Sequence, residues 1–394
     1  MQRLRALQRH RGGRRIVMVA HLHIAGLGGA EEVTRRLVGE WRSAGHGVVL
    51  VTYDDLPRVI RWRLRRLVFP YFVAYWLWQG RAGQLDIIDA TTGDTWLYGK
   101  FRRRRAAVLA VRSHALEMLG EKAHQQELSA NGQRPQWLRQ LYYGRWMLWE
   151  VRASLRYADV VRLLSAEEHD FCVHELGLPV SKLRVAPNGI SERWLAQDVA
   201  TASDPIGIAV VGRWEALKGV ATLVPALTAI VRAHPCTRVH LLGTGSAPVD
   251  VRQSFPADLQ QMLNVVEAFD PSELEHHLRD CHIYVSASHT EGFSLALAQA
   301  MASGLAPVAT RVGAAPGLLD DHPDLLFDVG DVDGCVERVV RLIRDREYLQ
   351  QMRRAARERV STLSWSNVAA STIDSYLDEG ASTMLASSSG ISPS

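Results

Sequence analysis

Glu291 follows a short apolar block at residues 283–288 and precedes a Leu- and Ala-rich stretch at residues 293–303. Such a block predicts a buried strand, and ligands of open α/β sheets collect at the carboxyl ends of strands. The later stretch predicts a helix starting at Phe293, whose first unpaired N–H groups favour an anion such as a diphosphate. A carboxylate and a helix start at one strand end therefore predict a site for a phosphate-bearing sugar. The alternative is an acid that only stabilises a helix start.

A glycine-containing turn follows this predicted helix. Gly304 is placed to end the helix, and residues 306–310 predict another buried strand. Residues 312–315 then predict a turn that lets the backbone approach a ligand closely. Two strand ends and one helix start are thus expected to converge on one place.

Two cations follow another strand-like block, at residues 206–212. Arg213 offers a planar fork for bidentate phosphate contact, whereas Lys218 offers a compact point charge. Only four of the 46 basic residues are Lys, and Lys218 is one of them. A chain that uses Arg almost everywhere but Lys here favours a specific role for Lys218. The alternative is a surface Arg and Lys beside a helix start.

These segments resemble the retaining glycosyltransferases of the GT-B fold, in particular the large group 1, or family four. The family hallmark is a Glu, seven residues and a second Glu; this chain has Glu291 and Gln299. The resemblance implies that Glu291 contacts the transferred sugar, that Gln299 contacts the ribose, and that Arg213 and Lys218 hold the diphosphate. Gln299 can bond a ribose through its carbonyl oxygen, without the strength of a charge-assisted bond.

The resemblance also implies other contacts. His114 follows a strand-like block at residues 107–111 and is expected beside the donor sugar, although a lone His is often structural. Gly243 and Gly245 form a tight turn that can pass near a nucleotide or serve as an ordinary loop. The expected donor-binding residues are Gly28, Gly29, Gly212, Gly243, Gly245, Val266, Gly292, Phe293, Ser294, Leu295 and Gln299.

Strand-like blocks also recur through the first half, at residues 15–20, 48–52, 86–90, 107–111, 160–165 and 183–186. Helical stretches between such blocks imply parallel sheets. The fold expected is α/β with GT-B architecture, meaning two Rossmann-like parallel-sheet domains facing a deep cleft.

The length of 394 residues exceeds a single core and predicts two domains. The predicted boundaries are a basic arm at residues 1–14, an acceptor domain at 15–190, a linker at 191–205, a nucleotide-sugar donor domain at 206–363, a crossing helix at 364–379 and a disordered tail at 380–394.

No metal and no cofactor is expected besides the donor. The four cysteines are scattered without CxxC spacing, which indicates neither a zinc site nor a disulfide framework and fits a cytoplasmic protein. Asp331 and Asp333 spell DxD, but their polar surroundings predict a turn and a helix cap.

The net charge of only +4 conceals two basic runs, six Arg in residues 3–15 and five in residues 58–66. Such runs attract anionic partners, including phospholipids on the inner face of the plasma membrane. Residues 67–78 form an aromatic, apolar run too short to cross a bilayer. This run either packs inside the first domain or lies in a membrane interface. No nucleic-acid module accompanies the arginines, and the first residues lack a signal-peptide pattern.

The function expected is retaining, metal-independent transfer of a sugar from a nucleotide-diphosphate sugar to a glycan or lipid-linked acceptor. A role in bacterial surface polysaccharide or glycolipid synthesis fits the aromatic, basic first half. Electrostatic stabilisation and positioning supply most of the catalysis in this interpretation, after domain closure. The alternatives are a nucleotide-sugar epimerase of similar fold and a catalytically weak glycosyltransferase-like binding protein. The sequence leaves the base open among UDP, GDP and ADP.

Overall fold

The protein is described by a computed structural model covering residues 13–26, 28–57, 59–60, 64–79, 84–102, 107–130, 132, 140–196, 199 and 201–377. The chain divides into two compact units. Unit 1 contains Met1–Lys122, Gly132–Gly189 and Trp365–Ser394, and unit 2 contains Ala123–Asn131 and Ile190–Ser364. Most of the predicted basic arm and the predicted disordered tail lie outside the described residues.

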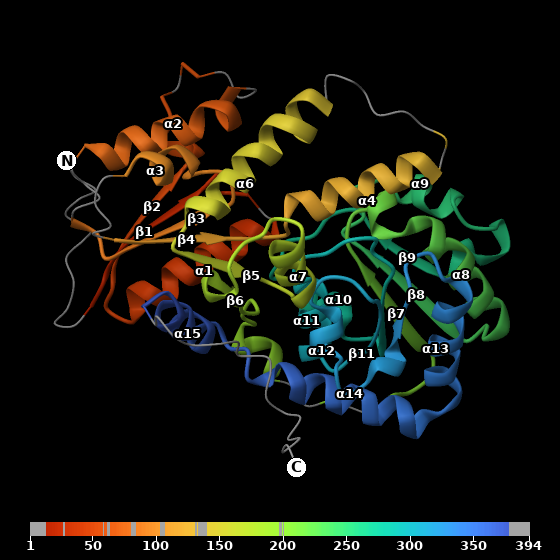
Figure 1. Cartoon of the computed structure of the whole chain (residues 1–394). Helices are drawn as coiled ribbons and strands as arrows, with labels where there is room; N and C mark the ends of the chain where they lie inside the picture. The colour runs from red at the N-terminus through yellow and green to blue at the C-terminus, as the bar shows by residue number, and fades with distance from the viewer. Residues whose placement is uncertain are drawn as a thin grey trace, which may run out of the picture. The chain divides into compact units, whose positions relative to one another are not determined.

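Unit 1 is built on a parallel six-stranded sheet with the order β2-β1-β3-β4-β5-β6 (Figure 1). Buried Val, Ile and Leu side chains dominate these strands, which explains why they read as apolar blocks in the sequence. The predicted blocks match the strands within one or two residues at each end. The strands are β1 (Arg15–Ala20), β2 (Gly47–Thr52), β3 (Ile87–Thr91), β4 (Val108–Arg112), β5 (Val160–Leu163) and β6 (Leu183–Val185).

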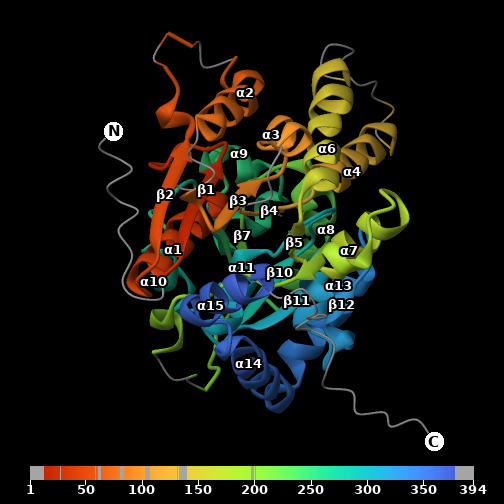
Figure 2. The ribbon, with the colours of Figure 1, turned by 60° about the vertical axis from the view of Figure 1, so that its left-hand side comes forward.

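Helices cover both faces of this sheet (Figures 1 and 2). One face carries α2 (Arg65–Trp78), α3 (Trp96–Phe101) and α6 (Leu148–Tyr157). The other carries α1 (Gly29–Ser43) and α15 (Trp365–Leu377), joined by a hydrogen bond from Trp41 Nε1 to the Ala369 carbonyl oxygen at 2.9 Å. The remaining elements of unit 1 are η2 (Tyr53–Asp55), η5 (Gln140–Met147), α7 (Ala166–His174) and η6 (Val180–Lys182). Helix α4 (Glu117–Ala130) begins in unit 1, and its residues from Ala123 onward belong to unit 2.

Unit 2 has a second parallel six-stranded sheet, in the order β12-β11-β10-β7-β8-β9. Chain order reverses between the neighbours β7 and β10, as it does between β1 and β3 in unit 1. Such switch points are where ligands of parallel sheets bind. The strands are β7 (Ile206–Val211), β8 (Thr237–Leu242), β9 (Leu263–Val266), β10 (Ile283–Ser286), β11 (Ala306–Thr310) and β12 (Leu326–Phe327).

The helices of unit 2 follow the strands in alternation. The longest are α8 (Val220–Ala233), α13 (Val332–Arg344) and α14 (Arg346–Ser361). The others are η7 (Glu192–Leu195), η8 (Ala216–Lys218), α9 (Pro248–Gln253), η9 (Ala257–Met262), α10 (Leu274–Leu278), α11 (Leu295–Ala302), α12 (Ala315–Leu318) and η10 (Pro323–Leu325).

A buried charge cluster fastens α15 to the sheet of unit 1. Asp89 on β3 is fully buried, pairs with Arg112 on β4, and accepts a hydrogen bond from the Tyr376 hydroxyl of α15 at 2.6 Å. Arg162 on β5 is the register partner of Arg112, and burial lowers the pKa of Arg162 to about 10. Arg112 therefore depends on the Asp89 carboxylate as its ion-pair partner, so the unit needs Asp89.

Removing the carboxylate should cost far more than removing the phenol. We expect Asp89→Ala to lower the free energy of unfolding by about 3–5 kcal/mol, because buried Arg112 then lacks its counter-charge. Tyr376→Phe deletes one hydrogen bond to a charged group and should cost about 2 kcal/mol. Urea unfolding followed by tryptophan fluorescence measures both losses, and equal losses would contradict this account.

Candidate donor site

The loops that follow β7 and β10 touch each other at the switch point of unit 2. Gly219 has φ +73°, and a Cβ built on it would lie 1.9 Å from the Ala287 carbonyl oxygen. The His289 N–H donates to the Leu217 carbonyl oxygen at 2.9 Å. Only glycine fits this approach, since a side chain would collide with backbone. The contact brings the two predicted functional segments together.

Lys218 and Glu291 meet where these loops touch. The Lys218 ammonium lies 2.5 Å from Glu291 Oε1, and the Ser288 hydroxyl donates to the same oxygen at 2.8 Å. The side chains are 33% and 17% exposed, so a ligand can reach both. Glu291 Oε2 has no partner within the described part of the chain and can accept a hydroxyl hydrogen bond. Ser288 was missed by the sequence analysis, although it lies only three residues before Glu291.

The turn after β11 supports the same loop from the other side. Gly313 has φ +56°, and a Cβ there would lie 2.5 Å from the carbonyl oxygens of Glu291 and Gly292. The Ala314 N–H donates to the Gly292 carbonyl oxygen at 2.9 Å. The sequence predicted that this turn lets backbone approach a ligand. In the structure the glycine permits a close approach to the chain's own Glu291–Gly292 backbone, and the approach to a ligand stays a prediction.

The helix after Glu291 begins two residues later than predicted. α11 starts at Leu295, because Ser294 has φ +57° and cannot belong to the helix. Ser294 is the one non-glycine residue with positive φ in the described ranges, and such strain concentrates at functional sites. No side chain caps this helix start, so its first N–H groups are available to an anion. The Phe293 ring is buried, which leaves only its backbone to contact a ligand.

Arg213 lies beside the glycine turn that follows β8. A Cβ on Gly245 would be 3.6 Å from Arg213 Cγ, and the Gly243 N–H donates to the Val266 carbonyl oxygen at 2.8 Å. The Arg213 side chain is 75% exposed and has a contact of 3.3 Å with Glu215, a weak surface pair. Gly212, with φ +144°, joins Arg213 to the Lys218 loop. These predicted donor residues of unit 2 thus form one neighbourhood.

Gln299 lies on α11, half-buried, with no hydrogen-bond partner for its side chain among the described residues. A partly buried amide without a partner is available to a ligand. The contact between Gln299 and the ribose therefore stays a prediction.

The predicted unit 1 contacts have a different environment. Gly28 precedes α1, and a Cβ on it would lie 2.5 Å from the Glu31 carboxylate. A carboxylate beside the Gly28–Gly29 loop repels a phosphate, which the sequence analysis did not foresee. His114 is half-buried after β4; burial, with smaller contributions from Arg112, His21 and Arg162, holds its pKa well below the ordinary value. A neutral imidazole suits a sugar hydroxyl.

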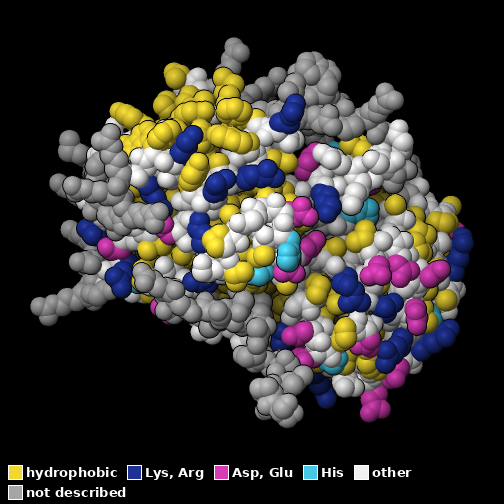
Figure 3. All heavy atoms as spheres, in the orientation of Figure 1, with side chains coloured by type: hydrophobic (Ala, Val, Ile, Leu, Met, Phe, Trp, Pro, Cys, Tyr) yellow, Lys and Arg dark blue, Asp and Glu magenta, His cyan; other side chains and the backbone are white. Residues whose placement is uncertain are grey.

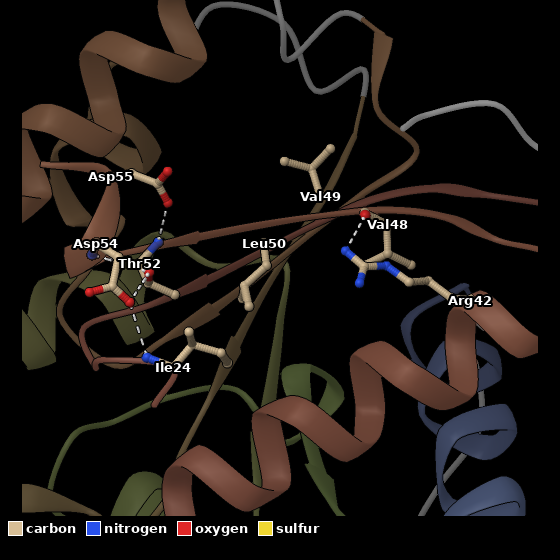
Figure 4. A pocket seen from close by; sticks show the side chains of 8 residues that line it. All are labelled: Ile24, Arg42, Val48, Val49, Leu50, Thr52, Asp54 and Asp55. Atoms are coloured by element: carbon tan, nitrogen blue, oxygen red, sulfur yellow. Dashed lines mark hydrogen bonds between the residues drawn. The ribbon is translucent and has the colours of Figure 1, made fainter. Parts of the chain in front are cut away.

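Two other features lie apart from these residues. Asp331 caps α13 by accepting from the Gly334 N–H at 2.8 Å, which confirms the predicted turn and cap. A hollow of about 270 Å³ lies along β2 (Figure 4). Its polar groups serve the local fold: Asp54 accepts from the Ile24 N–H, Asp55 from the Thr52 N–H, and Arg42 donates to the Val48 carbonyl oxygen.

Comparisons with known proteins address the fold and the family. The solved sucrose-phosphate synthase of Thermosynechococcus elongatus is 20% identical, with a TM-score of 0.72 over 92% of this chain and 98% of that chain. This likeness and the two parallel sheets confirm the predicted GT-B architecture. Glycogen synthase of Mycobacterium tuberculosis is 29% identical over 238 residues, 58% of this chain and 55% of that protein.

The chain spans about half the length of the curated relatives it matches. The D-inositol 3-phosphate glycosyltransferase of Saccharomonospora viridis is 27% identical over 237 residues, 57% of this chain and 54% of that protein. The family model described as Glycosyltransferase Family 4 matches residues 27–194, and the model described as Glycosyl transferases group 1 matches residues 205–345. These two matches together span most of the sequence, and the chain therefore belongs to the group 1 glycosyltransferases of family 4.

Proposed function

We propose that this protein transfers a sugar, with retention of configuration and without a metal ion, from a nucleotide-diphosphate sugar to a lipid-linked acceptor or glycan. The observation that carries the proposal is the Lys218–Glu291 pair at the switch point of unit 2. In this pair the Lys218 ammonium can bind the diphosphate, and the neighbouring Glu291 carboxylate can accept a hydrogen bond from a sugar hydroxyl. A role in bacterial surface polysaccharide or glycolipid synthesis is part of the proposal.

In the proposed mechanism the leaving diphosphate is stabilised by fixed positive charge. Arg213, Lys218 and the first N–H groups of α11 act on the oxygens that gain charge as the sugar departs. Glu291 and His114 orient the sugar through its hydroxyls. The acceptor hydroxyl attacks from the face that the diphosphate leaves, and its proton passes to a diphosphate oxygen. No enzyme base is required in this scheme.

A cytoplasmic location is proposed from the thiols. All four cysteines are free, and burial raises the pKa of Cys172, Cys281 and Cys335 to about 12. Such buried thiols stay protonated and unreactive, as expected of structural residues in a reducing compartment.

No helix in the described ranges is long and apolar enough to cross a membrane.

Peripheral contact with an anionic membrane is proposed from one aromatic face of unit 1. This aromatic face consists of α2, α3, η5 and α6, which contact one another in series. Its helices contain 14 of the 29 aromatic residues in the sequence. Figure 3 shows hydrophobic side chains gathered over α2. The large exposed side chains are Tyr71, Tyr75, Trp78, Phe101, Trp146 and Trp149.

The charges on the aromatic face match an anionic surface. Its sole acid is Glu150, which is 1% exposed and accepts a hydrogen bond from Trp96 Nε1 at 3.1 Å. Its cations, apart from Arg66 that pairs with Asp94, are Arg65, Lys100, Arg145, Arg152 and Arg156. Tyr and Trp rings sit at the headgroup level of bilayers, and nearby cations attract anionic lipids. This face therefore favours the interfacial alternative for one side of α2, while Phe69 and Leu77 on its other side pack in the core.

The donor proposal is tested by thermal unfolding with UDP, GDP or ADP and a chelator. A nucleotide at about 100 times its dissociation constant should add roughly 2.7 kcal/mol of stability. We expect one nucleotide to stabilise the protein, and Arg213→Ala and Lys218→Ala to lower sugar transfer by about 10²–10³. Arg232→Ala is the control, because this exposed Arg pairs with Asp258 on the surface of unit 2.

Wild-type turnover in both the Arg213 and Lys218 variants would contradict the assignment. Conversion of the donor to another nucleotide sugar without an acceptor would instead favour the epimerase alternative. These outcomes are separated by chromatography of the nucleotide products.

Substitutions of Gln299 test whether the amide at this position suits nucleotide binding. We expect Gln299→Ala to weaken binding of the stabilising nucleotide about fivefold, since one hydrogen bond is lost. Gln299→Glu should change the affinity by less than about threefold if the amide suits this site. Titration calorimetry measures both. A gain of more than about tenfold in Gln299→Glu would favour a weakened, binding-only protein.

The membrane proposal is tested by sedimentation with vesicles. We expect binding to vesicles that contain phosphatidylglycerol and not to pure phosphatidylcholine vesicles. The double variant Tyr75→Glu, Trp78→Glu should lose about tenfold or more in affinity, because it adds two anions to the aromatic face. Val180→Glu is a matched control, since Val180 is an exposed apolar residue of unit 1 outside the aromatic face. Equal loss in the control would refute the assigned surface.

A further inference from the structure

The switch point of unit 1 also carries a group of polar side chains. His21 directly follows β1, and Asp94 lies three residues after β3, its neighbour in the sheet. Because chain order reverses between these two strands, the loops diverge and leave room for a ligand at their carboxyl ends. The sequence analysis singled out neither residue, since each stands alone in its segment.

Asp94 fixes the orientation of the His21 ring. The Asp94 side chain is fully buried, and its two oxygens lie 2.9 and 3.0 Å from His21 Nδ1. An ionised carboxylate only accepts hydrogen bonds, so Nδ1 carries a proton, and in the neutral ring Nε2 presents a lone pair. His21 is 26% exposed, and Nε2 has no partner among the described residues. A ligand hydroxyl can therefore donate to Nε2.

The surrounding chain holds Asp94 in place. Arg66 of α2 lies 3.0 Å from Asp94 Oδ1. Gly93 has φ +83°, donates its N–H to the Ser154 hydroxyl at 2.8 Å, and would place a Cβ 2.9 Å from an Arg66 nitrogen. A side chain at position 93 would thus disturb the Arg66–Asp94 contact as well as the turn. The carboxylate is fixed before any ligand arrives.

The neighbouring groups suit an uncharged polyol more than a phosphate. His21 contributes to the lowered pKa of His114, after burial and Arg112. Glu117 accepts a hydrogen bond from the Thr92 hydroxyl at the same sheet edge. Arg66 pairs with Asp94, and Glu117 adds a second carboxylate, so these acids disfavour an anionic ligand beside His21.

We propose that His21 Nε2 accepts a hydrogen bond from a hydroxyl of the sugar acceptor, and that Asp94 is the positioning residue that fixes this ring. The inference rests on the proposed transfer reaction and names its acceptor as an amphiphile with a hydroxylated head. Trp96, two residues after Asp94, starts a row of ring contacts to Trp149 at 4.8 Å and from there to Trp146 at 5.5 Å. An apolar tail lies along the exposed Trp149 and Trp146 rings of this row while the head reaches His21.

The test uses n-octyl β-D-glucopyranoside as acceptor, with the nucleotide sugar of the stabilising base. We expect His21→Ala to raise the acceptor KM about tenfold, because a binding hydrogen bond is lost, and His21→Gln to restore part of it. The thermal shift given by the nucleotide should stay at its wild-type size in both variants. The matched control is His23→Ala, since His23 forms the same contact with Asp54 at 2.8 Å but both side chains are exposed.

The role of Asp94 is tested by locating the proton on the His21 imidazole ring. Nitrogen NMR of wild-type protein should find the His21 proton on Nδ1, and Asp94→Asn should shift it toward Nε2 and raise the acceptor KM. An unchanged acceptor KM in His21→Ala, or an equal rise in His23→Ala, would overturn the inference. Absence of transfer by wild-type protein that still responds to nucleotide would overturn the acceptor class. Absence of any nucleotide response would instead overturn the proposed function.

Discussion

The close approach of Gly219 to the Ala287 carbonyl oxygen is the constraint on which the candidate donor site depends. It joins the loop after β7 to the loop after β10, and the Lys218–Glu291 pair follows from that contact. Gly313 makes a similar close approach to the backbone carbonyl oxygens of Glu291 and Gly292. Three loops are thus fixed by backbone contacts that only glycine permits, which orients the charged side chains before a donor arrives.

Both units place polar residues at the switch point of a parallel sheet, but the two groups of residues differ in charge. Each parallel sheet reverses its chain order once, and polar residues gather at the carboxyl edge beside that reversal. In unit 2 the group is cationic, with Lys218, Arg213 and an uncapped helix start. In unit 1 the group contains imidazoles and carboxylates, such as His21 and Asp94. This division fits a diphosphate at one sheet and an uncharged hydroxyl at the other.

The strands could be predicted because their signals are local, since buried parallel strands have apolar sequences. Arg213, Lys218 and Glu291 lie in the loops that follow such strands, and their donor contacts stay a prediction. The start of α11 was misplaced, since no local pattern reveals the left-handed backbone of Ser294, whose side chain contacts the buried Tyr284 hydroxyl. The contact of Gly313 with the Glu291–Gly292 backbone could not be predicted, because the sequence does not reveal which backbone comes near a glycine.

The sequence by itself determined the strand blocks, the glycines and the types of side chain that end the strands, because these depend on neighbours within a few residues. The tertiary structure decided which strands are adjacent, and so which loops meet. His21 and Asp94 are 73 residues apart, and Lys218 and Glu291 are also 73 apart, yet each pair is in hydrogen-bond contact. Such pairs form only when sheet order brings distant strand ends together, which no local pattern encodes.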